Sequence, residues 1–262
     1  MERRKLLAIV ASLTVLLSVP LVLSSGLVDV SQFSPSGESG STPSIFTDPD
    51  KVIKDYLNDP GYQIGDKFWV QANISDVTDL YTWHVKMSWN KDVLNGSQIL
   101  YGDFLAGTTS PNGTSAEVAD ITGIFNDDGY GWVAESVLGS EPDVGVDGSG
   151  TLLEIEFLVV GYGCSELNVS ISGGLPTELL DSTGNNMTFT TTAGWFKNKL
   201  AGDSTSDGAV NVLDIGKINA HWYPGPPPGT LGYSRCVDNN DDGAINVLDI
   251  GVVNANWGRS VP

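Results

Sequence analysis

Between residues 45 and 198, apolar and polar residues alternate in short runs, as they do in half-buried β-strands. Three runs of alternating apolar positions stand out: Phe68, Val70, Ala72 and Ile74; Tyr81, Trp83, Val85, Met87 and Trp89; and Leu153, Ile155, Phe157 and Val159. Because successive side chains of a strand point to opposite faces, each run predicts a strand with one face against a core. Turn-forming clusters at 126–129, 147–150 and 182–185 separate such runs. The pattern predicts a mainly-β domain, a β-sandwich of the jelly-roll kind, over residues 45–198.

The N-terminal segment has a different composition. Met1 and Glu2 are followed by two arginines and a lysine, then by an uncharged apolar run over residues 6–23, and then by small residues. This order predicts a secretory signal peptide over residues 1–26, with an uncleaved membrane anchor as the alternative, because the run nearly reaches the length of a membrane span. Residues 27–44 are rich in Ser, Gly and Pro, which predicts a linker. In both cases the remaining chain is expected to be secreted or held at the cell surface.

Charge and sequons agree with export. The 262-residue chain carries a formal net charge of −19 and has a pI near 4.1, which argues against nucleic acid or an anionic membrane surface as partner. Five Asn-x-Ser/Thr sequons predict glycosylation of an exported domain. The sequons are at Asn73, Asn95, Asn112, Asn168 and Asn186.

The C-terminal segment, residues 199–262, contains one sequence twice. Residues 203–214 and 238–249 each place oxygen-bearing side chains at positions 1, 3, 5, 9 and 12 of a twelve-residue window, with Gly at position 6. This is the ligand spacing of a calcium loop that enters a helix. A single match is also typical of an Asx-rich turn before a capped helix, but two matches in register favour metal binding. We therefore expect two calcium ions.

The spacing assigns ligands to both loops. In the first loop they are Asp203, Thr205, Asp207, the carbonyl of Ala209, Asn211 through a water molecule, and Asp214; in the second they are Asp238, Asn240, Asp242, the carbonyl of Ala244, Asn246 and Asp249. A flexible shell made only of oxygen ligands favours Ca²⁺ over Zn²⁺ and Mg²⁺. Because Thr205 places a hydroxyl where the second loop has an amide, the first site is expected to bind more weakly. Asp241, at position 4, is expected to face solvent.

Two loops of the form D-x-[NT]-x-D-G-x-[VI]-N-x-x-D, each followed by one short helix, resemble the dockerin module of cellulosome-type assemblies. The resemblance covers residues 202–258. It implies a small α-helical module that folds around two calcium ions and binds a cohesin partner through loop positions 10 and 11. These positions are Val212, Leu213, Val247 and Leu248. Many bacterial dockerins carry hydroxyl residues there, so this chain is expected to present an aliphatic contact surface instead.

Several segments of the β-domain resemble a cohesin domain. They are residues 73–81, 87–90, 93–95, 102–105, 148–157, 179–181 and 193–196. The resemblance implies a jelly-roll sandwich that binds dockerins on one sheet face and is similar in fold to some carbohydrate-binding modules. It does not assign the residues of that face.

Sugar binding and glycoside hydrolysis are the two alternative functions for the β-domain. Trp69, Trp83, Trp89 and Trp132 are either a sugar-stacking platform or core residues, and the strand alternation favours the core for at least some of them. The acidic pair Glu154 and Glu156, like Asp127 and Asp128, has the spacing of charges on an exposed strand or turn. A glycosidase needs one carboxyl group in a pocket that raises its pKa, so we expect no enzyme activity. The two histidines, His84 and His221, have no nucleophile motif beside them.

The sequence as a whole predicts an extracellular, non-catalytic adaptor that mediates calcium-dependent cohesin–dockerin assembly. The expected partners are cohesin- or dockerin-bearing proteins, including a second copy bound head to tail, because the connection over residues 196–203 is too short for the module to swing onto its own sandwich. The alternative is a carbohydrate-binding sandwich carried on a calcium-dependent dockerin, with polysaccharide as ligand. Cys164 and Cys236 either bridge the two domains or remain free.

Overall fold

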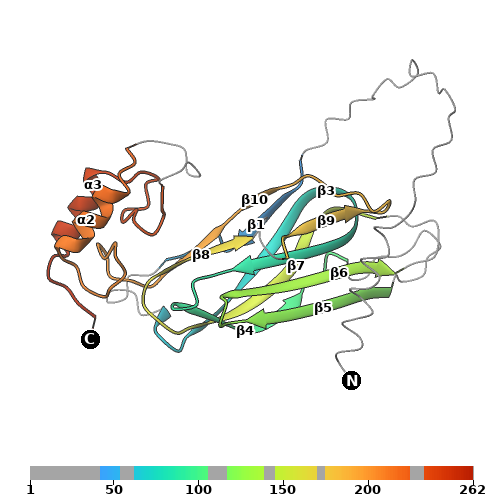
Figure 1. Cartoon of the computed structure of the whole chain (residues 1–262), viewed down its shortest axis with the longest axis horizontal. Coiled ribbons are helices and arrows are strands. Elements are labelled where there is room, and N and C mark those ends of the chain that lie inside the picture. Colours follow the sequence, from blue (N-terminus) through green and yellow to red (C-terminus); the bar gives the residue numbers. More distant parts are fainter. Residues whose placement is uncertain are drawn as a thin grey trace, which may run out of the picture. The chain divides into compact units, whose positions relative to one another are not determined.

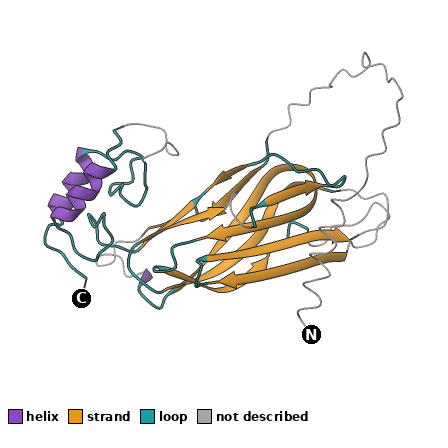
Figure 2. Cartoon of the chain, in the orientation of Figure 1, coloured by secondary structure: helices purple, strands orange, loops and turns teal. Residues whose placement is uncertain are grey.

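The computed structural model describes residues 42–53, 62–105, 117–138, 145–169, 175–224 and 233–261. The strands are β1 (Ser44–Asp48), β2 (Lys51–Ile53), β3 (Lys67–Ser88), β4 (Leu94–Tyr101), β5 (Glu117–Phe125), β6 (Tyr130–Leu138), β7 (Val146–Val159), β8 (Cys164–Val169), β9 (Glu178–Asp181), β10 (Thr190–Thr192) and β11 (Gly194–Lys197). The helices are α2 (Val212–Ala220) and α3 (Val247–Ala255). Among the described residues, every strand precedes both α-helices along the chain (Figures 1 and 2).

Strand β3 connects the two layers of the β-domain. Its first half pairs with β1 and β7, and its second half pairs with β6, β8 and β9. Between the halves the register shifts, and Asp76 and Asp79 adopt the left-handed region at φ 57° and 63°. Each bulge inserts one residue and bends the strand, so one long strand passes from one layer to the other.

The two layers enclose one hydrophobic core. One layer continues from β3 through β7 to β4 and through β1 to β10, and the other includes β6 with β5 and β8 with β11 and β2. All apolar residues of the three alternating runs are buried except Tyr81, which packs partly buried against the core. The predicted mainly-β sandwich is confirmed, and its jelly-roll subclass stays a prediction.

The four candidate tryptophans of the β-domain do not share one surface. Trp83 is fully buried and Trp89 is nearly so, which places both in the core. Trp69 is 39% exposed on the first half of β3, and Trp132 is half-buried on β6. A platform of all four rings is therefore excluded.

A second, smaller core lies in the C-terminal segment. It consists of Leu200, Val210, Ile218, Val237, Ile245 and Val253. Both helices contribute to it, because Ile218 of α2 and Val253 of α3 are buried. We call the described part of this segment, residues 199–224 and 233–261, the C-terminal module.

Some sequence-based expectations concern residues outside the described ranges. These are the signal peptide or anchor over residues 1–26, most of the linker over residues 27–44, and the sequon at Asn112. No helix in the described part of the chain is long and apolar enough to cross a membrane. Of the other sequons, Asn186 is exposed, whereas Asn73, Asn95 and Asn168 are half-buried.

The contrast between two tryptophans of β3 gives a stability test. Replacing Trp83 by Ala removes a fully buried side chain and should lower the free energy of unfolding by about 3–5 kcal/mol. The same change at Trp69, which is partly exposed, should cost less than about 1 kcal/mol. Urea unfolding followed by tryptophan fluorescence measures both values. Equal losses for the two variants would contradict this assignment of the core.

Candidate metal centres

Each of the two loops reverses direction at positions 4 and 6. Ser206 and Gly208 have φ values of 60° and 82°, and Asp241 and Gly243 have 58° and 84°. Glycine is required at position 6 of the first loop for a second reason, since a Cβ there would lie 2.6 Å from Val261 Cγ2. The left-handed residues fold each loop back around the carboxylate at position 1.

The carboxylates at position 1 accept the amides of these reversals. In the first loop Asp203 accepts from Gly208 at 3.0 Å and from Asp207 at 3.2 Å. In the second loop Asp238 accepts the amide of Gly243 at 2.9 Å and that of Asp242 at 3.3 Å. Both position 1 residues are fully buried. The loops therefore wrap around a carboxylate, as the ligand spacing predicts.

The carboxylate at position 12 closes the first loop and starts its helix. Asp214 accepts the amide of Thr205 at 2.9 Å and the amide of Asn211 at 2.8 Å, while the Asn211 side chain caps α2 through the Leu213 amide. This reciprocal arrangement is a capping box. Asp214 is fully buried.

The second loop repeats this arrangement. Asp249 accepts the amides of Asn239 at 2.7 Å and Asn246 at 2.8 Å, and Asn246 caps α3 through the Leu248 amide. Asp249 is also fully buried. Asn211 and Asn246, expected as ligands through water, thus use their side-chain oxygens as helix caps.

The two loops differ at position 3. The Thr205 hydroxyl lies 3.2 Å from Asp203 Oδ1 and 2.9 Å from Asp214 Oδ1, so it joins the carboxylates of positions 1 and 12. Asn240 instead is exposed and donates to Asp242 Oδ2 at 2.7 Å. The hydroxyl is therefore better placed inside its loop than the amide that takes the same position in the second.

The carboxylates at position 5 are exposed. Asp207 accepts the amide of Ala209 at 3.0 Å, and Asp242 accepts the amide of Ala244 at 2.9 Å. Within the described ranges, no three His, Cys, Asp or Glu side chains lie close enough together to hold a metal ion. Metal binding by the loops therefore stays a prediction, and the buried carboxylates are what supports it.

Electrostatics within each loop favours a cation. Burial raises the pKa of Asp203, and the charge of Asp214 raises it further. Burial likewise raises the pKa of Asp249, and the charge of Asp238 adds to the rise. Two carboxyl groups in one buried loop are costly unless a positive charge offsets them. Since all side-chain donors at the predicted ligand positions carry oxygen, the donor set fits a hard cation such as Ca²⁺.

Each loop is closed by the segment that follows the other loop's helix. Val210 of the first loop exchanges backbone hydrogen bonds with Arg259 at 2.8 Å and Gly258 at 2.9 Å, both beyond α3. Ile245 of the second loop pairs with Tyr223, just beyond α2, through two hydrogen bonds of 2.7 Å. The two copies therefore depend on each other for their folded shape.

The expected contact residues at positions 10 and 11 lie at the helix starts and are exposed. Val212, Leu213, Val247 and Leu248 are between 58% and 65% exposed. Two tryptophans that the sequence-based assignment missed, Trp222 and Trp257, follow the two helices and are also exposed. The signal was present, because each copy of the repeat runs on into Asn-Ala-x-Trp. The module thus presents six large apolar side chains to solvent.

Cys164 and Cys236 form a disulfide between β8 and the segment that precedes the second loop. This decides between the bridged and the free state of the two cysteines, which the sequence left open.

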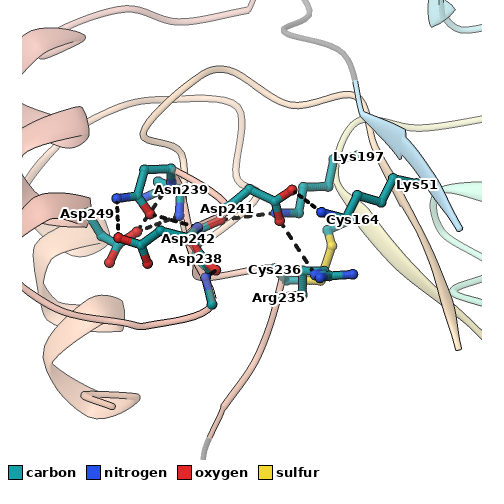
Figure 3. A network of polar contacts seen from close by, with 12 residues as sticks. Lys51, Cys164, Lys197, Arg235, Cys236, Asp238, Asn239, Asp241, Asp242 and Asp249 are labelled. Carbon is teal, nitrogen blue, oxygen red and sulfur yellow. Dashed lines mark hydrogen bonds and ion pairs between the residues drawn. A yellow bond between two sulfur atoms is a disulfide. The ribbon is translucent and has the colours of Figure 1, made fainter. Parts of the chain in front are cut away.

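The expectation that Asp241 faces solvent is wrong. Its carboxylate lies 3.0 Å from Lys51 Nζ, 3.5 Å from Arg235 Nε and 3.8 Å from Lys197 Nζ (Figure 3). The physical reason is that the disulfide and the left-handed turn at position 4 bring this residue against basic side chains from β2 and β11.

Two buried lysines fasten the first residue of each loop. Lys199 Nζ donates to the carbonyl oxygens of Asp203 at 2.6 Å and Cys236 at 2.5 Å. Lys197 Nζ donates to the carbonyl oxygen of Asp238 at 3.0 Å. Burial, together with the nearby charge of Lys197, lowers the pKa of Lys199 to about 7. The sequence pattern assigns no role to either lysine.

No known protein family matches the chain, and no curated protein matches it either. Among solved structures, the chain is similar to a non-cellulosomal cohesin from the archaeon Archaeoglobus fulgidus, with 16% identity, a TM-score of 0.43, and coverage of 60% of this chain and 91% of that one. A type II cohesin domain from the cellulosome of Acetivibrio cellulolyticus gives 13% identity, a TM-score of 0.44 and coverage of 60% and 95%. A type I cohesin–dockerin complex from Clostridium thermocellum gives 15% identity, a TM-score of 0.45, and coverage of 60% of this chain and 99% of that one. The likeness to cohesin domains concerns the fold.

Two glycines test the geometry of the first loop. Gly208→Ala should destabilise the module by about 1–2 kcal/mol, because φ is 82° there and the added Cβ would meet Val261. Gly216→Ala is the matched control, since Gly216 lies in α2 with no atom within 4 Å of the added Cβ, and should stabilise by about 0.5–1 kcal/mol. Thermal unfolding followed by far-ultraviolet circular dichroism measures both. Two shifts of the same sign would contradict the prediction.

Proposed function

We propose that this protein is an extracellular, non-catalytic adaptor that mediates calcium-dependent cohesin–dockerin assembly, with a cohesin-like sandwich and a dockerin-like C-terminal module. The observation that carries the proposal is the repeated loop. In both copies the carboxylates at positions 1 and 12 are fully buried, and the aliphatic pair at positions 10 and 11, at the helix start, is exposed. A module that folds around metal ions and presents an apolar surface is suited to protein recognition rather than to chemistry.

The residues that would hold calcium are those predicted from the spacing. Asp203, Thr205 and Asp214 already converge in the first loop, and Asp238 and Asp249 are buried in the second. Bound calcium would supply the positive charge that offsets these carboxylates. Asp214 also accepts the amide of Asn211 at the start of α2, so the loop and the helix start are held by one side chain. Fixing the loop therefore also fixes the first turn of α2, from which Val212 and Leu213 extend.

The acidic pair on β7 gives no support to glycosidase chemistry. Hydrogen bonds from Lys67 and Ser97 lower the pKa of Glu156, which is the opposite of what a glycosidase acid needs. Its neighbour on the same strand face, Glu154, accepts the side-chain amide of Gln71 at 2.6 Å. Hydrolysis therefore has no acid in a suitable environment at this pair.

The proposed partner is another molecule rather than the chain's own sheet face. The disulfide to Cys236 and the ion pairs of Asp241 tie the module to its own sandwich, so it has little freedom to swing. The exposed aliphatic pairs would then dock onto a cohesin-bearing protein or onto a second copy of this chain. Contacts of the second kind join molecules head to tail. Polysaccharide binding has less support, since of the four candidate tryptophans only Trp69 and Trp132 reach the surface.

Removal of calcium tests the metal requirement. The module spans only about 60 residues, a size at which an apolar core alone is marginal, so we expect excess chelator to unfold it and to abolish docking together. Far-ultraviolet circular dichroism should show loss of the α2 and α3 signal in EDTA and its return with calcium. An unchanged spectrum in excess chelator would refute the metal requirement.

Replacement of the aliphatic pairs tests the docking surface. The full exported chain is immobilised and offered purified type I and type II cohesins and a second copy of itself. At least one should bind in calcium and be released by EDTA. The double variant Leu213→Asp, Leu248→Asp should bind at least about 100-fold more weakly, because each change removes the transfer free energy of an exposed leucine from the interface and buries a charge.

The control and the contrary outcome use the same assay. Trp69→Ala lies on the sandwich, outside the module, and should bind its protein partner as the parent does. If Trp69→Ala instead abolishes retention on polysaccharide and the leucine variant binds proteins normally, the carbohydrate-binding alternative replaces this proposal.

A further inference from the structure

The two loops have nearly the same sequence and internal hydrogen bonds, yet their surroundings differ at position 4. This position is left-handed in both and supplies no predicted ligand. The first loop has the uncharged Ser206 there, whereas the second has Asp241. Ser206 lies beside the β7–β8 turn, because a Cβ added to Gly163 in that turn would be 3.5 Å from the Cβ of Ser206. Asp241 makes ion pairs instead.

The partners of Asp241 come from two strands of the sandwich and from the loop's own approach. Lys51 lies in β2, Lys197 ends β11, and Arg235 precedes the loop (Figure 3). The Lys197 side chain is only 6% exposed. A partly buried charge with several partners is screened less by salt and is held more firmly than an exposed pair.

Three contacts therefore hold the backbone between residues 236 and 241. The disulfide fixes Cys236, the ammonium group of Lys197 fixes the carbonyl of Asp238, and the ion pairs fix Asp241. Asp238 is the position 1 carboxylate of the second loop. In the first loop, the residue that corresponds to Cys236 is Ala201 and position 4 is uncharged, so this set of ties belongs to the second loop.

We propose that Lys51, Lys197 and Cys164 of the sandwich are positioning residues for the second metal loop. They fix the backbone over residues 236–241, so that less of the loop has to be ordered when an ion binds. The inference rests on the proposed calcium function and extends it: the sandwich fixes the backbone of the second loop through ion pairs and a disulfide that have no counterpart in the first loop.

Asp241 has a second effect in this arrangement. The three basic groups around Asp241 would repel a calcium ion bound in the second loop, and the Asp241 carboxylate offsets part of their charge. Loss of Asp241 therefore both loosens the loop and leaves positive charge beside it. Both effects lower the calcium affinity of the second loop.

Linkage makes the effect reciprocal. If the disulfide strengthens calcium binding to the second loop, bound calcium must stabilise the disulfide by the same free energy. Reduction by dithiothreitol follows thiol–disulfide exchange: the dithiol donates two electrons and two protons, the bond between Cys164 and Cys236 opens to two thiols, and the reagent closes to its cyclic disulfide. Calcium should therefore shift the equilibrium of this exchange towards the disulfide.

The first experiment is a calcium titration of the full exported chain by isothermal calorimetry, resolving two sites. Asp241→Asn should weaken one site by about tenfold and leave the other within about twofold. The double variant Cys164→Ser, Cys236→Ser should weaken the same site. Asp241→Glu, which keeps the charge, should recover most of the loss. Ser206→Ala, the matched change in the first loop, and Asp127→Asn, the same charge change on an exposed turn of the sandwich, should leave both sites as in the parent.

The second experiment tests the positioning role without measuring calcium affinity. Thiol labelling and mass spectrometry follow the fraction of open disulfide at equilibrium in buffers of known ratio of reduced to oxidised dithiothreitol. Calcium should raise the ratio needed to open half of the molecules by about tenfold in the parent and by much less in Asp241→Asn. A merely structural role of Asp241 would change this ratio by the same factor with and without calcium.

The outcomes separate the two levels of the argument. If the parent protein binds no calcium, the proposed function and this inference both fail. If the parent binds two ions, while Asp241→Asn and the cysteine variant keep both affinities and calcium does not shift the reduction of the disulfide, only the positioning role of the sandwich is overturned.

Discussion

The C-terminal module depends on the buried carboxylate at the last position of each loop. Asp214 and Asp249 accept amides from the start of their loop and from the helix cap at once. One side chain thus decides where the loop ends, where the helix begins and how the two are joined. The carboxylate is charged and lies inside the fold, so the same residue that organises the backbone also creates the demand for a cation.

Sequence pattern predicted what depends on local order along the chain. The alternation in β3 and β7 gave the buried faces, since a strand repeats every two residues, and the loop spacing gave the carboxylates that end up inside each loop. The exposure of Val212 and Leu213 likewise follows from their place beside the helix cap. Such features need only neighbours within a few residues.

What the sequence could not predict depends on contacts between distant segments. Asp241 lies 190 residues from Lys51 in the chain, and no local pattern indicates that they meet. The two buried lysines, Lys197 and Lys199, look like ordinary charged residues of a linker, because their role depends on backbone carbonyls supplied by both loops. The bulges at Asp76 and Asp79 were also invisible, since they interrupt the alternation and need cross-strand partners to define them.

The crossed closure of the two loops has an architectural consequence. The segment that pairs with the first loop lies beyond α3, and the segment that pairs with the second loop lies beyond α2. A single copy of the repeat would therefore keep the segment after its helix but lack the loop with which that segment pairs. The two copies on this chain exchange these segments with each other, as the two subunits of a domain-swapped dimer exchange an identical element. Removing either half would take away the segment that closes the loop of the other.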